Sequence, residues 1–354
     1  MNRNYFQTIN NQNIQKEFFQ NLSTPTPNPN PTPNPIPIFP SILPNTDQLR
    51  AFKFSSNVAI LNMYFIQLFV YFFKNNIDSL TMSQALETIN SSNLLPLNAI
   101  AVSLLTYTCI NGNSIIQSYG GMIVEYNMTS FIVLRGTQLG CEWNMDANHK
   151  LVTPSWIDPT RNSGVLVHSG FNKIYTNSYK TTAGEGHLSL RDQIVYYISL
   201  NRMLSIIITG HSLGGGICYL LAADLSANFL NLRKITKIYP IAGPYSGNQN
   251  FIDVITSFGF SIPNYTGVFA IINTADKVPN LILRLQYKRI PSQLFCFTIP
   301  GSTEQAHLPL TYRQGLEING PMFDKNVAAN CSSCGVDCKI TDTYINTICP
   351  CCRK

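Results

Sequence analysis

Charge is scarce in this chain. Only 12% of its 354 residues are Asp, Glu, Lys or Arg, and the formal net charge is +6. The basic residues form no long block and no stripe interleaved with aromatic residues. A surface that binds nucleic acid needs such a basic patch. The composition therefore indicates a protein with no nucleic-acid partner.

An apolar leader is also missing. Met1–Leu22 is rich in Asn and Gln and lacks the apolar core of roughly 7–15 residues that a secretory signal peptide carries. We therefore expect no secretory signal peptide and an intracellular protein. Four cysteines are scattered through the body of the chain, and we expect them to be free thiols of a reducing compartment: Cys109, Cys141, Cys218 and Cys296.

The chain begins with two segments of different composition. Residues 1–47 are polar and rich in Pro and Asn, which predicts a disordered linker because they can bury little apolar surface. Residues 48–90 are predicted to be an apolar helical segment. Within it, Phe54–Phe73 has no charge over twenty residues and just reaches the length of a bilayer span. A buried or surface-docking helix is the first interpretation, and a single membrane anchor or a membrane-associated surface is the second.

Hydrophobic residues are plentiful, at 45% of the chain, so a large core is available. Strand-like runs alternate with helical ones, as in Lys237–Ala242, Asn248–Phe258 and Gly267–Asn273. This alternation predicts an α/β fold with a mainly parallel central sheet and helices on both faces. Upstream, residues 121–134 predict a β-hairpin. Leu94–Ile110 predicts a helix packed on the sheet.

The stretch around Ser212 is the strongest chemical signal. The apolar run 205–208 precedes Gly210-His211-Ser212-Leu213-Gly214, and an Ala/Leu-rich helical stretch follows. A strand, a tight turn bounded by Gly210 and Gly214, and a helix together are typical of a nucleophile elbow. The serine would stand at the apex of the turn, and the helix N-terminus would point at a developing oxyanion.

A serine nucleophile needs a base and an acid that orients the base. In enzymes with such an elbow the acid and then the histidine follow the serine along the chain. His307 is the one histidine after Ser212. Asp276 directly follows an apolar strand, at the end where the carboxyl ends of parallel strands meet. The sequence therefore predicts Ser212, Asp276 and His307 as a catalytic triad.

Hydrolysis of an ester also needs hydrogen-bond donors for a tetrahedral oxyanion. The backbone N–H of Leu213, directly after the nucleophile, is one candidate. Thr137 is the other, because it follows the apolar strand 132–134 at Arg135-Gly136 and offers both an N–H and a hydroxyl.

Five motifs occur in an ordered series: Arg135-Gly136-Thr137, Val167–Phe171, Gly210–Gly215, Gly243–Asn248 and Asp276–Pro279. In this order they resemble the class 3 (fungal-type) triacylglycerol lipases over about 91–320. The resemblance implies an α/β-hydrolase fold and an ester hydrolase that acts on acylglycerols or related lipids. It implies no metal or organic cofactor for catalysis. It also implies that Ser212, Asp276 and His307 are the triad and that Thr137 and Leu213 are the oxyanion donors.

The resemblance further implies a short lid after the oxyanion turn, at about 138–150. Leu139, Trp143 and Met145 would present an apolar face to lipid, while Glu142 and Asp146 would stay in water.

The tail 321–354 is rich in cysteine. Cys331, Cys334, Cys349 and Cys352 nearly fit the spacing of a four-thiolate zinc site. A structural zinc site, disulfides or an unstructured tail, and acylation all stay open, and none bears on catalysis.

Two alternatives accompany the lipid ester hydrolase. One is a protein that docks on lipid or membrane through a hydrolase scaffold without turnover. The other keeps the chemistry and changes the substrate, as a phospholipase or an acyltransferase would.

Overall fold

A seven-stranded sheet forms the centre of the molecule. The computed structural model describes residues 35–325 except 52, 112–113, 181–185, 201–203, 257–266, 281–285 and 289–293. The strand order is β1-β2-β3-β8-β9-β10-β11. Their bounds are Ile100–Asn111, Ser114–Tyr126, Thr129–Leu134, Ser205–His211, Thr236–Ile241, Ala270–Asn273 and Leu294–Phe297. Strands β3, β8, β9, β10 and β11 run parallel to one another. Strand β2 is antiparallel to both of its neighbours, β1 and β3. The predicted mainly parallel sheet is confirmed.

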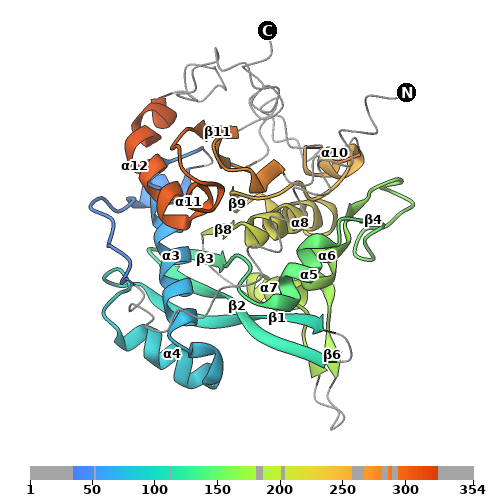
Figure 1. Cartoon of the computed structure of the whole chain (residues 1–354), viewed down its shortest axis with the longest axis horizontal. Helices are drawn as coiled ribbons and strands as arrows, with labels where there is room; N and C mark the ends of the chain where they lie inside the picture. Colours follow the sequence, from blue (N-terminus) through green and yellow to red (C-terminus); the bar gives the residue numbers. More distant parts are fainter. Residues whose placement is uncertain are drawn as a thin grey trace.

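Helices cover both faces of this sheet (Figure 1). One face carries α2 (Thr46–Arg50), α3 (Ser56–Lys74), η1 (Ile77–Ser79), α4 (Met82–Ser91) and α12 (Pro309–Lys325). The other carries α5 (Gly140–Ala147), α6 (Ser169–Thr176), α7 (Leu190–Leu200), α8 (Leu213–Asn228) and α10 (Gln249–Thr256). The remaining elements are short: α9 (Leu230–Arg233), η2 (Val278–Asn280), α11 (Thr303–His307), and the strand pairs β4 (Leu151–Val152) with β5 (Val167–His168) and β6 (Tyr179–Lys180) with β7 (Gly186–His187).

The alternation of side chains along β8 explains why two helical layers are needed. Ile206 and Ile208 enter the hydrophobic cluster under α8, and Ile207 enters the cluster under α3. Successive side chains of a strand point to opposite faces, so a strand that is apolar at every position must be buried on both. The run of isoleucines therefore forces the layered α/β arrangement.

The predicted helix at Leu94–Ile110 is wrong. Strand β1 begins at Ile100 and pairs along its length with β2. An apolar run can be a helix or a buried strand, and the long antiparallel partner decides for the strand. The predicted hairpin is present between β2 and β3. Its turn residues Asn127 and Met128 both have positive φ, at 47° and 60°, as a two-residue hairpin loop requires.

The apolar segment before the sheet lies in the core. Helix α3 packs on β3, β8 and α12, and Val58, Phe65 and Phe69 are fully buried in it. It has the length and hydropathy of a membrane span, yet 67% of that window is buried inside the protein. The helix is therefore buried in the structure, which agrees with the first interpretation, a buried or surface-docking helix. Residues 49–89 and the sheet share one hydrophobic cluster.

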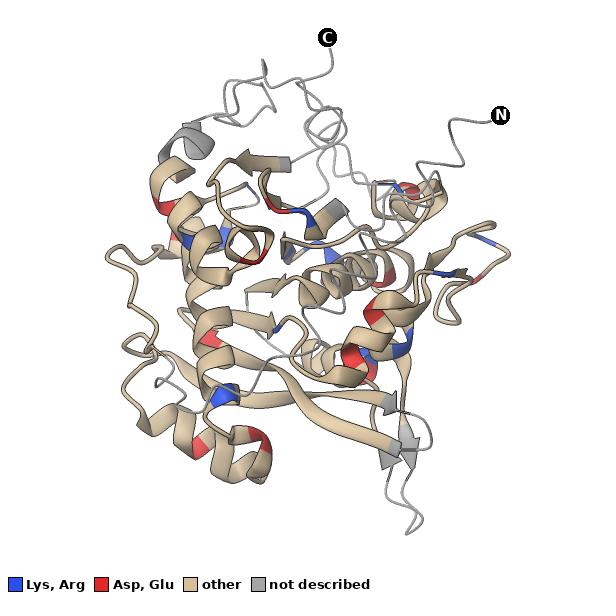
Figure 2. Cartoon of the chain, in the orientation of Figure 1, with Lys and Arg blue, Asp and Glu red and all other residues tan. Residues whose placement is uncertain are grey.

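The sparse charged residues are scattered over the elements (Figure 2). Among the residues that the structure describes, six of them are nevertheless fully buried: Arg135, Glu142, Asp224, Arg233, Lys237 and Asp276. A buried charge is costly unless hydrogen bonds and a counter-charge compensate it. These positions therefore mark the interactions on which local structure depends.

Lys237 joins the N-terminal segment to the sheet. Its Nζ donates to the carbonyl oxygens of Leu49, Ala51 (3.1 Å) and Gln48 (3.4 Å) at the C-terminal end of α2. These carbonyls have no partner within the helix, so the ammonium group caps them. Burial lowers the pKa of Lys237 from 10.5 to about 8.

This lowered pKa predicts a dependence of stability on pH. Between about pH 8 and pH 10.5 the unfolded chain binds more protons at Lys237 than the folded chain, so the free energy of unfolding rises with pH. The wild type should gain about 2 kcal/mol relative to Lys237→Met between pH 7 and pH 9.5. Urea denaturation of both proteins at each pH measures this, because other titrating groups cancel in the difference. A difference that stays constant with pH would contradict the assignment.

Candidate active site

Ser212 stands at the apex of a strained turn between β8 and α8. Its backbone has φ 57° and ψ −120°, a conformation that L-residues rarely adopt. Its N–H donates to the carbonyl of Ile241 (3.0 Å), and its carbonyl accepts the first helical hydrogen bond from Gly216 (2.9 Å). A Cβ on Gly214 would lie 2.6 Å from the carbonyl oxygen of Leu134. Only glycine lets helix α8 approach the sheet this closely.

The structure brings the three predicted triad side chains together. His307 Nε2 lies 2.9 Å from Ser212 Oγ, and His307 Nδ1 lies 2.7 Å from Asp276 Oδ2. Asp276 is fully buried, whereas the His307 side chain is 18% exposed. One ring nitrogen thus faces the hydroxyl and the other faces the carboxylate, which is the geometry of a base with its orienting acid.

His307 is held by a short helix. It is the last residue of α11, whose N-terminus is capped reciprocally by Ser302 and Gln305. Asn273, at the end of β10, donates to the carbonyl of Ala306 (3.1 Å). Strand β10 therefore positions both Asp276, three residues beyond it, and the backbone next to His307.

Asp276 has two further partners. The Tyr312 hydroxyl, on α12, donates to Asp276 Oδ2 (2.7 Å), and the Val278 N–H donates to Oδ1 (2.9 Å). Both oxygens of the buried carboxylate are therefore engaged, which compensates its burial and fixes its orientation. Tyr312 was not among the residues predicted from the sequence. No local motif marks it, because only the packing of α12 brings it to the acid.

His211, the variable residue of the elbow, faces the base. It is buried, and its ring centroid lies 4.7 Å from that of His307. Burial, and secondarily the charge of His307, lower the pKa of His211 well below its usual value. His211 is therefore neutral and places no competing charge beside His307.

The predicted oxyanion turn lies against the nucleophile. A Cβ on Gly136 would be 3.1 Å from the Cβ of Ser212. The next residue, Thr137, is buried, and its hydroxyl donates to Asp146 Oδ2 (2.5 Å). Burial raises the pKa of Asp146 well above its usual value, although the hydrogen bond from Thr137 opposes this. Leu213, the other predicted donor, is the first residue of α8, where backbone N–H groups lack helical partners.

Helix α5 lies where the sequence predicts a lid. Its side chains, however, are more buried than those of a lid with an apolar face open to lipid would be. Met145 is buried in the core, while Leu139 and Trp143 are half-buried. Glu142 does not stay in water. It is fully buried and accepts from Arg135 Nη2 at 2.7 Å. The expected exposure of Glu142 is therefore wrong, because the basic residue of the preceding turn draws its carboxylate inward.

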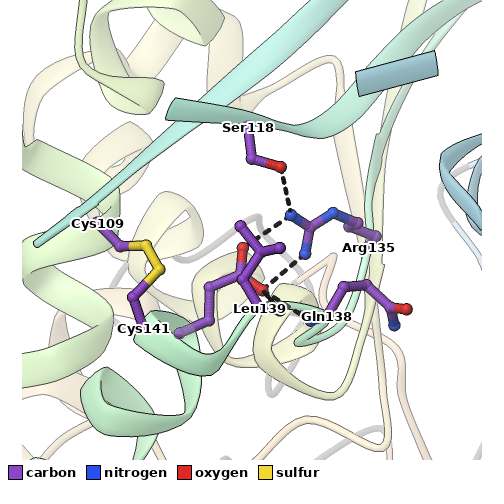
Figure 3. The surroundings of a disulfide bond; sticks show 7 residues. Cys109, Ser118, Arg135, Gln138, Leu139 and Cys141 are labelled. Atoms are coloured by element: carbon purple, nitrogen blue, oxygen red, sulfur yellow. Dashed lines mark hydrogen bonds and ion pairs between the residues drawn. A yellow bond between two sulfur atoms is a disulfide. The ribbon is translucent and has the colours of Figure 1, made fainter. Parts of the chain in front are cut away.

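A disulfide ties α5 to the edge of the sheet. Cys141 on α5 is bonded to Cys109 on β1, with Cα atoms 6.1 Å apart (Figure 3). The expectation of free thiols is wrong for this pair, since the fold brings together two residues that lie 32 positions apart. Cys218 is a free buried thiol, as expected. Intracellular residence stays a prediction, and this pair no longer supports it, because disulfides persist mainly in oxidising compartments.

The predicted zinc ligands lie outside the described residues, namely Cys331, Cys334, Cys349 and Cys352. Within the residues that the structure describes, no group of three or more His, Cys, Asp or Glu side chains could hold a metal ion.

Comparison with known proteins identifies relatives for the middle of the chain. Residues 131–285 match the protein family described as Lipase (class 3). The chain is 29% identical over 187 residues to Phospholipase A1-II 3 of Oryza sativa subsp. indica. This aligned region covers 47% of this chain and 42% of the relative. It is 33% identical over 167 residues to Phospholipase A1-Igamma2, chloroplastic, of Arabidopsis thaliana. This aligned region covers 42% of this chain and 30% of the relative. The chain thus covers less than half the length of these curated relatives.

Among solved structures, the Rhizomucor miehei lipase propeptide complex aligns with 82% of this chain and 92% of its own at 16% identity, with a TM-score of 0.45.

The disulfide yields a prediction about stability. Closing a loop with a sequence separation of 32 should stabilise the protein by about 3–4 kcal/mol. The double variant Cys109→Ser/Cys141→Ser should lose about that free energy of unfolding relative to wild type. Cys218→Ala is the matched control, because it removes a buried sulfur and leaves the disulfide in place. In denaturant without reductant, an alkylating reagent should leave Cys109 and Cys141 unmodified. Alkylation of both would show that the bond is absent.

Proposed function

We propose that this chain, whose residues 131–285 match the class 3 lipase family, is a serine hydrolase that cleaves the carboxylic esters of lipids. One observation carries the proposal. A continuous chain of hydrogen bonds joins Ser212, His307 and Asp276 at the apex of a strained elbow. A serine in an ordinary strand–helix turn needs neither this backbone strain nor a histidine on its hydroxyl.

The proposed reaction begins with attack of Ser212 Oγ on the ester carbonyl. His307 Nε2 accepts the hydroxyl proton, and Asp276 stabilises the imidazolium through Nδ1. The tetrahedral oxyanion would receive hydrogen bonds from the backbone N–H groups of Thr137 and Leu213. His307 then donates its proton to the leaving alcohol, which leaves an acyl group on Ser212. Water activated by His307 releases the acid and restores the serine.

The mechanism obtains its nucleophile, its acid–base group and its oxyanion donors from the protein. We therefore expect turnover without an added metal ion or organic cofactor. The names of the relatives direct the choice of substrate: two are phospholipases A1, and another is a galactolipase. We propose that the substrates are acylglycerols or phospholipids, whose carboxylic esters differ in head group and share the bond that is cleaved. Docking at a membrane surface is part of this proposal.

The first test is loss of the nucleophile. Ser212→Ala should reduce turnover of a p-nitrophenyl ester by roughly 10⁴-fold or more and abolish labelling by a fluorophosphonate probe. Ser91→Ala, on the exposed surface of α4, is the matched control and should behave as the wild type. A panel of triacylglycerols, phospholipids and galactolipids then identifies the substrate class. Liposome binding without turnover of any ester would instead indicate a lipid-docking protein.

A second test concerns the hydroxyl that holds the acid. Tyr312→Phe removes the donor from Asp276 Oδ2 and should lower kcat about tenfold with KM nearly unchanged, since one hydrogen bond to a charged group contributes about 1.5 kcal/mol. Tyr64→Phe is the matched control. It also removes a hydrogen bond from a buried tyrosine, to the carbonyl of Leu94, far from the triad along the chain. Equal effects of both variants on kcat would contradict a positioning role for Tyr312.

A further inference from the structure

A buried carboxylate lies behind the oxyanion turn. Glu142 accepts from Arg135 Nη1 (2.8 Å) and Nη2 (2.7 Å), and both side chains are fully buried. The same carboxylate accepts from the backbone N–H groups of Gln138 (2.7 Å) and Leu139 (3.1 Å). Four donors thus converge on Glu142, and two of them belong to the backbone directly after Thr137.

Arg135 fixes this arrangement to the sheet. Its Nη2 donates to Ser118 Oγ (3.1 Å; Figure 3). Its Nε donates to the carbonyl of Tyr119 (2.8 Å), and both partners lie on β2. Its Nη1 also donates to the carbonyl of Gly136 (2.9 Å), and the ring of Phe73 lies 4.4 Å from the guanidinium carbon. The guanidinium therefore cannot move without breaking contacts to β2. Glu142 binds both this fixed guanidinium and the backbone N–H groups of Gln138 and Leu139, and so it restricts the movement of the turn.

The position of helix α5 does not depend on Glu142 alone. The neighbouring residue Cys141 is covalently bonded to β1, and Asp146 accepts from Thr137. Loss of the Glu142 charge would thus leave α5 tethered. The groups that would lose a charged acceptor are the guanidinium of Arg135 and the N–H groups of Gln138 and Leu139.

We propose that Glu142 is a positioning residue for catalysis: through Arg135 and two backbone N–H groups it holds the 136–139 turn so that the donors of Thr137 are aimed at the oxyanion before substrate binds. This inference rests on the proposed hydrolase function and adds a residue that does not touch the substrate. Donors fixed in advance stabilise the transition state without reorganisation during the reaction. A looser turn would weaken the tetrahedral state more than the bound ester.

The test variant is Glu142→Gln. It keeps the size of the side chain but loses the charge. Both backbone N–H groups and Arg135 Nη1 donate to Oε2, and Arg135 Nη2 donates to Oε1. An amide nitrogen in either position therefore faces a donor of Arg135 with which it cannot pair. We expect kcat per active site, titrated with a fluorophosphonate, to fall about 10- to 100-fold on a short p-nitrophenyl ester, with KM changed by less than about twofold. The affinity for an alkyl trifluoromethyl ketone, which forms a hemiketal oxyanion on Ser212, should fall by the same factor as kcat/KM.

The matched control is Asp224→Asn. Asp224 is another fully buried carboxylate, and it accepts from Arg191 Nε (2.6 Å) and from the Tyr175 hydroxyl (2.7 Å). It lies twelve residues along the chain from Ser212, and its hydrogen-bond partners Tyr175, Arg191 and Asn228 lie on α6, α7 and α8. Its loss should lower the melting temperature without changing kcat per titrated site or the affinity for the ketone. Glu142→Asp, which keeps the charge but is one methylene shorter, serves if Glu142→Gln does not fold, and should show a smaller loss of the same kind.

The outcomes separate the two proposals. Unchanged kcat and ketone affinity in a folded Glu142→Gln protein would overturn the positioning role, as would equal losses in Glu142→Gln and Asp224→Asn. Absence of ester turnover and of fluorophosphonate labelling in the wild type would overturn the hydrolase function itself, and the positioning role with it.

Discussion

The backbone of Ser212 is held in a conformation that its surroundings must enforce. With φ at 57°, the residue would relax if the elements around it could separate. They cannot separate, for two reasons. Gly214 at the start of α8 packs so closely on the end of β3 that no Cβ would fit between them, and the Ser212 N–H donates a hydrogen bond to the carbonyl of Ile241 at the end of β9. The exposure of one hydroxyl therefore depends on three adjacent parallel strands and one helix. The layered core supplies the free energy that keeps this strain in place.

The N-terminal helical segment is part of that core. Helix α3 covers the face of the sheet opposite α8, and Lys237 caps α2 from the sheet side. Without α3, the residues of β3, β8 and β9 that face it would be exposed to water. Its high hydropathy is explained by burial between the sheet and α12. A buried core helix and a membrane-spanning helix can have the same apolar composition, so hydropathy does not distinguish them.

The site is assembled from segments that are far apart in the sequence, and each functional group has a buried partner behind it. Tyr312 on α12 stands behind Asp276, and Glu142 with Arg135 stands behind the turn of Thr137. These partners are charged or hydroxylic groups in an apolar interior, where a hydrogen bond is strong and an unmatched group is costly. Such contacts restrict the orientation of the reacting groups, and that restriction is what hydrolysis through an oxyanion requires.

Several features could be predicted from the sequence because their causes are local. The elbow needs glycines at fixed spacing, and the parallel sheet needs strands that are apolar on both faces. Asp276 directly follows an apolar strand, and His307 is the one histidine after Ser212. The tertiary structure alone decided that 100–111 is a strand, because its long partner β2 outweighs an ambiguous apolar pattern. It alone paired Cys109 with Cys141 and buried Glu142 against Arg135. Whether a side chain meets water or a partner depends on which distant elements pack beside it, and the residue and its neighbours in sequence do not contain that information.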